Sequence, residues 1–302
     1  MSPADPLTAP RPLALGATLL VVGAAWGATL VTGKLAVSTG HHPAGLIFWQ
    51  LALTVAVLGP LAVVRGRRPA LTREALTLYV GVALLGTLIP NAASFVAFTA
   101  LPAGVVAIVL ATAPMITVLL AAFSGAERRP GPLRLVGVGL GGAAMILLLG
   151  PEASLPDPAA WPFVVLCLLT PLCYGAEGVF VKLRAPVATD PVAALLGASI
   201  LGMIALAPLL AALPSLRVPF PGPFGPAEQA ILIGGILHAG CYWGYLRLIG
   251  LGGPVYASLI SYVVTLSGVL WGVALLSERH SGWIWAALAV MLAGMALVQP
   301  RR

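Results

Sequence analysis

Apolar residues dominate this chain in long runs that short polar segments separate. Ten runs occur, at 13–35, 43–64, 75–98, 102–124, 133–150, 161–183, 191–213, 228–250, 254–276 and 282–299. An α-helix of about 20 residues crosses a hydrocarbon core about 30 Å thick. The runs lack the alternation of barrel strands, and backbone groups in lipid need internal partners. The pattern predicts an all-α integral membrane protein with ten transmembrane helices.

A Glu-Arg pair between two apolar runs, here called the elbow, occurs twice. Glu127-Arg128 and Glu278-Arg279 lie 151 residues apart, and a shift of 148 residues pairs Lys34 with Lys182. The same shift pairs Gly27 with Gly175, Pro43 with Pro191 and Pro60 with Pro208. The alternative is that spans of similar composition align loosely by chance.

Each half then holds five spans, and an odd number forces the second half to enter the membrane from the opposite side. We expect two inverted five-helix repeats around a central cavity, the first in residues 13–150 and the second in 161–299. Residues 1–12 are expected to form an N-terminal tail on the cytoplasmic side.

Charged residues are few, and the basic ones are concentrated in the loops on one side of the predicted membrane spans. Only 8% of residues are charged, and the net charge is +7. With a cytoplasmic N-terminus, thirteen of the sixteen basic residues lie on the cytoplasmic side, and Lys34, Arg217 and Arg279 lie outside. The positive-inside rule therefore places both termini in the cytoplasm. These basic loops face anionic lipid, so nucleic acid is not an expected partner.

Glu177 is the only acid well inside an apolar run. It shares a helical face with Tyr174, one turn before it, and with Thr170, two turns before it. Acids within a membrane are costly, so the residue is a candidate for proton coupling or for binding a substrate amino group. The alternative is an acid paired near the helix end with Lys182 or Arg184.

Several other spans mix aromatic rings with short polar groups, which suits an apolar ligand with a polar head. His238 near the middle of its span is a cavity candidate, or else a histidine satisfied in the core. The full set of substrate-binding candidates is Trp26, Asn91, Phe95, Tyr174, Glu177, His238, Tyr242, Ser258, Tyr262 and Thr265. Gln50, the one strongly polar side chain of its span, is expected to bond across helices.

Prolines inside spans free a backbone carbonyl and permit a kink. Pro90, Pro114 and Pro171 are hinge candidates, although a static kink is the commoner role. Three cysteines within apolar runs have no metal-like spacing, and no enzyme motif occurs. We expect no catalytic residue, no metal and no cofactor.

Three segments carry a family resemblance. They are AAWG at 24–27, TAPMITVLLAAFSGAER at 112–128 and SYVVTLSGVLWGVALLSER at 261–279. With the ten spans and the two Glu-Arg elbows, the chain resembles the EamA-type branch of the drug/metabolite transporter superfamily. Family members commonly have a proline in the ninth span, where this chain has Thr265, so a mechanism with two symmetric proline kinks is in doubt.

The resemblance implies alternating access in a bacterial inner membrane, with the cavity lined from spans one, three, six, eight and nine. Within the superfamily the chain is most similar to bacterial aromatic amino acid exporters. The resemblance therefore implies export of amino acids, aromatic ones included. The expected surroundings are membrane lipid, and a monomer is sufficient. The alternatives are another metabolite or drug, an anionic metabolite carrier, and a channel or signalling protein. An anion carrier needs deep Arg or Lys, and a channel needs a polar stripe through every layer.

Overall fold

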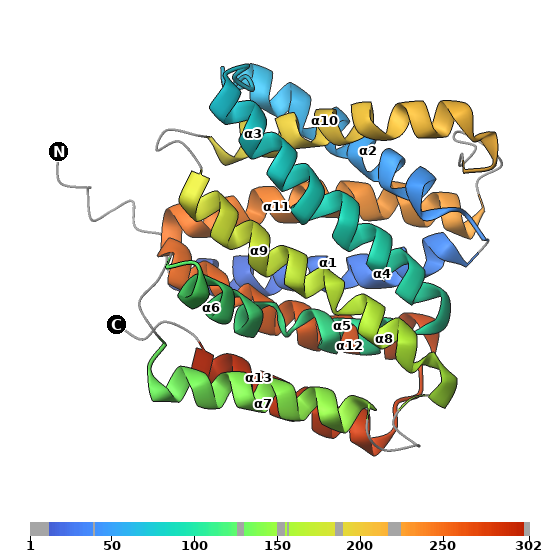
Figure 1. Cartoon of the computed structure of the whole chain (residues 1–302), viewed down its shortest axis with the longest axis vertical. Coiled ribbons are helices and arrows are strands. Elements are labelled where there is room, and N and C mark those ends of the chain that lie inside the picture. The colour runs from blue at the N-terminus through green and yellow to red at the C-terminus, as the bar shows by residue number, and fades with distance from the viewer. Residues whose placement is uncertain are drawn as a thin grey trace.

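The computed structural model describes residues 12–38, 40–125, 130–149, 155, 157–184, 190–216 and 225–298. Within these ranges every regular element is a helix. The helices lie side by side with their axes roughly aligned, and successive spans run in opposite senses across one bundle (Figure 1). This agrees with the predicted helical fold class, because long apolar segments satisfy their backbone groups within each helix.

The first half contains seven α-helices and one π-helical segment. Their bounds are α1 Pro12–Val37, α2 Pro43–Val64, α3 Arg73–Val82, η1 Ala83–Leu88, α4 Ile89–Ala100, α5 Ala103–Leu110, α6 Ala113–Phe123 and α7 Pro132–Leu149. Segments α3, η1 and α4 follow one another without a gap and together form the predicted third span. The predicted fourth span is divided into α5 and α6.

The second half begins with a short 3-10 turn. The bounds are η2 Pro158–Ala160, α8 Trp161–Cys167, α9 Leu169–Arg184, α10 Pro191–Ala212, η3 Pro214–Leu216, α11 Pro226–Ser258, α12 Ile260–Leu276 and α13 Gly282–Val298. The loop predicted at 251–253 is helical instead, because α11 continues to Ser258 and only Leu259 separates it from α12. The predicted boundary between the eighth and ninth spans was therefore misplaced.

Seven stretches of the described chain are long and apolar enough to cross a membrane. They are Leu13–Val37, Pro43–Val64, Arg73–Ala100, Ala103–Phe123, Pro132–Leu149, Pro158–Arg184 and Pro191–Ala212. Two shorter apolar helices, Ile260–Leu276 and Gly282–Val298, complete this group. Together they account for nine of the ten predicted runs, and the remaining run lies in α11.

The three hinge candidates lie in the first turn after a change in the helix. Pro90 follows the π-helical segment η1, Pro114 follows the break between α5 and α6, and Pro171 follows the break between α8 and α9. A proline has no N–H to donate to the preceding turn, so the helix is interrupted just before it. Movement at these positions stays a prediction.

Each helix of the first half packs against helices of the second half that correspond to the packing partners of its own counterpart. By the sequence shifts, α1 corresponds to α8 with α9, α2 to α10, the third span to α11, and the fourth span to α12. Helix α1 packs against α11 and α12, while α9 packs against α3, α4 and α6. The pairs α7 with α13 and α2 with α10 form opposite edges of the bundle (Figure 1).

Burial differs between the two ends of the bundle. We call the end that holds Lys34 the Lys34 end, and the opposite end, where α9 finishes, the Lys182 end. Seven of the eight residues of α5, at the Lys34 end, are buried. Only Met115 and Ala121 are buried among the eleven residues of α6, which continues towards the Lys182 end. The fourth span is therefore tightly enclosed in one half of its length only.

The buried apolar residues form one large cluster at the Lys34 end and three small ones towards the Lys182 end. The largest cluster includes the second half of α1, most of α5, and Val164 and Cys167 of α8. Towards the Lys182 end the buried residues form three separate small clusters, on α3 with α10, on α2 with α10, and on α11 with α12. Apolar packing thus joins the helices more continuously at the Lys34 end.

Candidate functional site

Glu177 of α9 faces the π-helical segment η1. A Cβ atom placed on Gly86 would collide with the Glu177 carboxylate, so the glycine leaves the space that this side chain occupies. A π-helical turn holds one more residue than an α-helical turn and often marks a functional position. Glu177 is half-buried, and among the described residues it has no hydrogen bond or ion pair. The predicted pairing with Lys182 or Arg184 is not found there.

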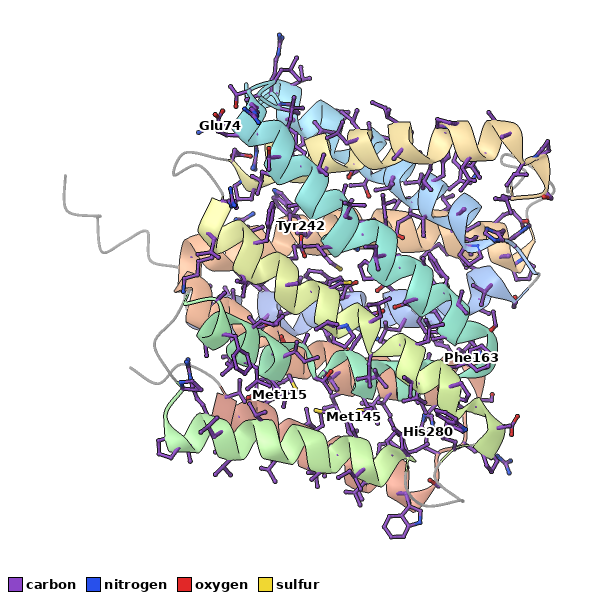
Figure 2. All side chains as sticks on the ribbon, viewed as in Figure 1. Glu74, Met115, Met145, Phe163, Tyr242 and His280 are labelled. Atoms are coloured by element: carbon purple, nitrogen blue, oxygen red, sulfur yellow. The ribbon has the colours of Figure 1, made fainter. Side chains whose placement is uncertain are left out.

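Two tyrosines accompany this acid. Tyr174 lies on α9 and Tyr242 on α11, and both are within electrostatic range of the Glu177 carboxylate. Tyr242 also packs against the small cluster that contains Leu58 and Val192. Figure 2 shows Tyr242 within the length of the bundle rather than at an end. The structure thus brings together three of the sequence-predicted residues, Tyr174, Glu177 and Tyr242.

Asn91 forms a polar contact between the second and third spans. Its Nδ2 atom donates a hydrogen bond to Gln50 Oε1 over 2.9 Å. The prediction that Gln50 bonds across helices is confirmed. Because each amide has further donors or acceptors, this pair retains hydrogen-bonding capacity beyond the bond that it forms.

A second polar contact joins α4 to α9. The buried Thr170 hydroxyl donates to the Pro90 carbonyl over 2.9 Å, and its oxygen lies 2.9 Å from Ser94 Oγ. Thr170 was predicted to share the face of Glu177, and this face does lie against the third span. The contact satisfies two hydroxyls that would otherwise be costly to bury.

Trp26 and His238 pack against each other. Their ring centroids are 6.2 Å apart at an interplanar angle of 89°, and Tyr245 approaches Trp26 at 5.9 Å. These edge-to-face contacts link α1 to α11. Two further sequence-predicted residues are therefore brought together, in an aromatic cluster of Trp26, His238 and Tyr245.

The remaining candidates are not shown to join either group. Phe95 and Tyr262 are partly buried against the largest hydrophobic cluster. Thr265 is buried, and its hydroxyl donates to Ser261 O of its own helix over 2.8 Å. The side chain of Ser258 lies outside the described residues. No group of three or more metal-ligating side chains occurs among the residues that the structure describes.

Two hollows lie away from these residues. A cavity of about 460 Å³ at the Lys34 end is lined by residues of α1, α4 and α12, including Lys34, Phe98 and Glu278. A groove of about 420 Å³ lies between α1 and α11 and is lined by Thr18, Trp243 and Arg247 among others. None of the described substrate-binding candidates lines either hollow.

The Lys34 end holds a polar arrangement that the sequence analysis missed. Lys34 Nζ donates to the carbonyl oxygens of Phe98 and Leu101, the latter over 2.8 Å. Glu278 Oε1 accepts from the Ala103 amide over 2.6 Å, and Oε2 accepts from the Gly104 amide over 3.0 Å. One turn, between α4 and α5, is thus held from α1 on one side and from the end of α12 on the other.

Two features of the sequence pointed towards this arrangement. Lys34 is one of only three basic residues that the predicted orientation places outside, and Glu278 belongs to the repeated Glu-Arg pair. Lys34 entered the predicted orientation and Glu278 the predicted repeat, but neither pattern indicates which backbone groups the two side chains bind. Those contacts join residues more than sixty positions apart.

The fold and these buried polar contacts define a multi-pass α-helical membrane protein. The profile of the EamA-like transporter family matches residues 14–150 and again residues 161–299. Because the two matches cover most of the sequence, the chain belongs to this family, whose domain it contains twice. The prediction of a membrane transporter in the drug/metabolite transporter superfamily is confirmed at this level.

Solved structures support the same fold. One, titled "Crystal structure of protein", has a TM-score of 0.64 and 20% sequence identity, and the alignment covers 94% of each chain. At this identity the similarity establishes the fold alone. A comparison with curated proteins finds no match.

Proposed function

We propose that this transporter exports amino acids, aromatic ones included, by alternating access. The observation that carries the proposal is the half-buried Glu177 carboxylate beside Tyr174 and Tyr242, with no cationic partner among the described residues. A carboxylate in an apolar bundle needs a positive or donating partner, and a substrate ammonium group supplies one. The neighbouring rings suit an apolar or aromatic side chain.

The amide pair of Gln50 and Asn91 offers groups for the other end of an amino acid. Asn91 lies in the third span, as Gly86 does, and its amide keeps one N–H beyond the bond to Gln50. An N–H of this kind can donate to a substrate carboxylate. We infer that Glu177 binds the ammonium group and that Asn91 contributes to binding the carboxylate.

The proposed topology has both termini in the cytoplasm of a bacterial cell, with the protein in the inner membrane. The distribution of basic residues supports it, since thirteen of sixteen then lie on the cytoplasmic side. In this orientation the Lys182 end faces the cytoplasm and the Lys34 end faces outwards. The halves 13–150 and 161–299 act as inverted repeats that enclose a central cavity, and a monomer is sufficient.

Two other substrate classes remain within transport. A different small metabolite or drug would use the same rings without needing the Glu177 charge. An anionic metabolite would need a deep cation, but Lys34 lies at a helix end and donates to two backbone carbonyls. The present arrangement favours a substrate with an ammonium group over an anion.

The test is flux through the purified protein in liposomes. Vesicles loaded with labelled phenylalanine, threonine or methionine should release them in a saturable way, with competition among the three. Glu177→Gln should reduce this flux strongly, whereas Glu74→Gln, at an exposed acid in the first turn of α3, should not. Absence of flux for all three amino acids would refute the substrate class.

A further inference from the structure

The groove between α1 and α11 lies on the perimeter of the bundle. It has a volume of about 420 Å³, and its described lining consists of four residues of α1 and five of α11. Ala14, Gly240 and Leu251 of this lining are exposed. The groove therefore faces the surroundings of the protein rather than the interior of the bundle.

The two helices are antiparallel and approach each other closely at glycines. A Cβ atom on Gly234 would lie 2.7 Å from Thr32 Oγ1, and one on Gly244 would lie 2.6 Å from Val22 Cγ2. One turn before Gly244, the Cβ position of Gly240 has no atom within 4 Å. Glycine thus brings the helices together at 234 and 244, and at 240 it leaves the groove unobstructed.

Arg247 is the only charged residue in the described lining of the groove. Its guanidinium carbon lies 5.6 Å from the centre of the Trp243 ring, within the range of a cation–π contact. This contact holds the guanidinium group against α11. Among the described residues no carboxylate forms an ion pair with Arg247. Within the part of the chain that the structure describes, the groove thus presents a positive charge without a counter-ion.

The spacing of charges along α11 places Arg247 at a membrane interface. Glu228 lies in the first turn, Arg247 follows nineteen positions later, and no Asp, Glu, Lys or Arg lies between them. Nineteen residues of α-helix span about 28 Å, close to the hydrocarbon thickness of about 30 Å. Arginine and tryptophan side chains are both favoured at such an interface.

The groove continues from Arg247 into one leaflet. Towards the membrane centre it reaches Gly240, seven residues or about 10 Å further along α11. Half of the hydrocarbon core is about 15 Å thick. Gly244 and Val22 line this part, so it is apolar. A charged position at the interface is therefore joined to an apolar section that covers most of one leaflet.

This combination fits a lipid better than a free anion. A free phosphate would find one guanidinium group and few other donors, because the Thr18 hydroxyl already donates to Ala14 O over 2.8 Å. A phospholipid uses both parts of the groove, since its phosphate pairs with the arginine and its acyl chain covers the apolar section. A zwitterionic head group would also bring a second positive charge close to Arg247, which an anionic one does not.

We propose that this groove binds one anionic phospholipid, with its phosphate on Arg247 and an acyl chain along Gly240 and Gly244. A guanidinium group matches a phosphate with paired hydrogen bonds, and basic pockets between membrane helices on the cytoplasmic side bind anionic head groups. Only the choice of the cytoplasmic leaflet rests on the proposed function, through its topology. The lipid bridges α1 and α11 on the side away from the candidate site.

Native mass spectrometry of the purified full chain in detergent tests this site. Dioleoyl phosphatidylglycerol is titrated in parallel with dioleoyl phosphatidylcholine, which has the same acyl chains. Phosphatidylglycerol should bind about tenfold more tightly, and Arg247→Gln should abolish the difference, because it removes charge-assisted hydrogen bonds. Gly240→Leu places a side chain in the open groove and should weaken phosphatidylglycerol binding. Both positions are exposed, so the two variants should fold.

Two matched controls use residues away from the groove. Arg73→Gln removes an exposed basic residue at the start of α3, and Gly142→Leu adds the same side chain at an exposed glycine of α7. Neither should change lipid binding. Equal binding of the two lipids, or unchanged phosphatidylglycerol affinity in Arg247→Gln or Gly240→Leu, would overturn the proposal. A dimer in lipid-free detergent that Gly240→Leu disrupts would also overturn it and assign the groove to a second copy. Absence of amino acid flux would refute the proposed substrate and leave the lipid site standing.

Discussion

The Glu278 carboxylate accepts a hydrogen bond from the Ala103 amide over 2.6 Å, although 175 residues separate them. The bond joins the end of the ninth span to the start of the fourth, which are counterparts in the two halves of the chain. Because the acceptor is charged and the donor lies at a helix N-terminus, the contact is stronger than an ordinary amide bond. It gives the elbow of the second half a defined structural role.

Acidification should weaken this region through His280. Burial lowers the pKa of His280, and the Glu278 carboxylate opposes that shift only in part. The folded protein therefore binds this proton less readily than the unfolded chain. The stability gained from neutral His280 is present above about pH 6.5 and is lost as the pH falls through the lowered folded-state pKa. Thermal unfolding in detergent between pH 7.5 and 5.5 should show this loss.

The charged groups around the ring define the control for that experiment. His280 faces Glu278 and the amide end of α5, with Arg279 next in sequence and Lys34 beyond Glu278 on α1. From α13, the Trp285 ring lies 6.1 Å from the His280 ring. His280→Phe should remove the acid-dependent step. His41 Nε2 also lies beside a carboxylate, 3.0 Å from Glu228 Oε1, so His41→Gln should be measured in parallel. A step unchanged in His280→Phe would contradict this assignment.

Replacing Glu177 should affect both substrate binding and pH dependence. A hydrogen bond to a charged group is worth about 1.5–3 kcal/mol, so Glu177→Gln should raise the KM for an amino acid by roughly tenfold or more. If the acid also couples protons, the same variant should transport at a rate independent of pH. An unchanged pH profile would remove the proton role, and an unchanged KM would remove the binding role. Glu74→Gln is the control.

Gly86→Ala should impair transport. The added methyl group would collide with the Glu177 carboxylate and force either this side chain or the π-helical segment to move. Gly142→Ala on α7 is a matched control, because no atom lies within 4 Å of its Cβ position. We expect flux in liposomes to fall in the first variant only. Equal flux in both would show that the contact between Gly86 and Glu177 is not needed for transport.

Gly27→Ala should destabilise the packing of α1 on α12. Its Cβ atom would lie 2.8 Å from the Gly268 amide nitrogen and 3.0 Å from Val264 O, and backbone atoms cannot rotate away. Overpacking of this kind costs about 1–3 kcal/mol. Thermal unfolding should show the loss, whereas Gly139→Ala, with no neighbour within 4 Å, should be neutral or slightly stabilising. Equal midpoints would contradict the close approach of these helices.

The sequence was sufficient for the helical class because apolar run length is a local property. Two of the prolines named as kink positions, Pro114 and Pro171, follow breaks in the helix, whereas Pro60 and Pro208 lie inside unbroken helices. The predicted end of the eighth span at residue 250 was wrong, because the glycines at 250, 252 and 253 do not by themselves end a helix. In the same way, the pairing of Gln50 followed from its isolation in an apolar span.

The candidate site was predicted less completely. Helical spacing grouped Thr170, Tyr174 and Glu177, but only the fold shows that Tyr242 joins them and that Trp26 meets His238. The contacts of Lys34 and Glu278 are with backbone groups, which carry no sequence signal. They could not be inferred without knowing which helices are neighbours.

The π-helical segment Ala83–Leu88 also changes the phase of the third span. One extra residue rotates everything after it by about 100° relative to an uninterrupted α-helix. The face of α3 that packs on α10 and the face of α4 that carries Asn91 are therefore not related by the regular spacing of 100° per residue. A single-residue deletion within 83–88 that returned the segment to a regular α-helix would therefore keep Asn91 facing Gln50. A helical wheel drawn through the whole span places these two faces wrongly, however apolar its residues are.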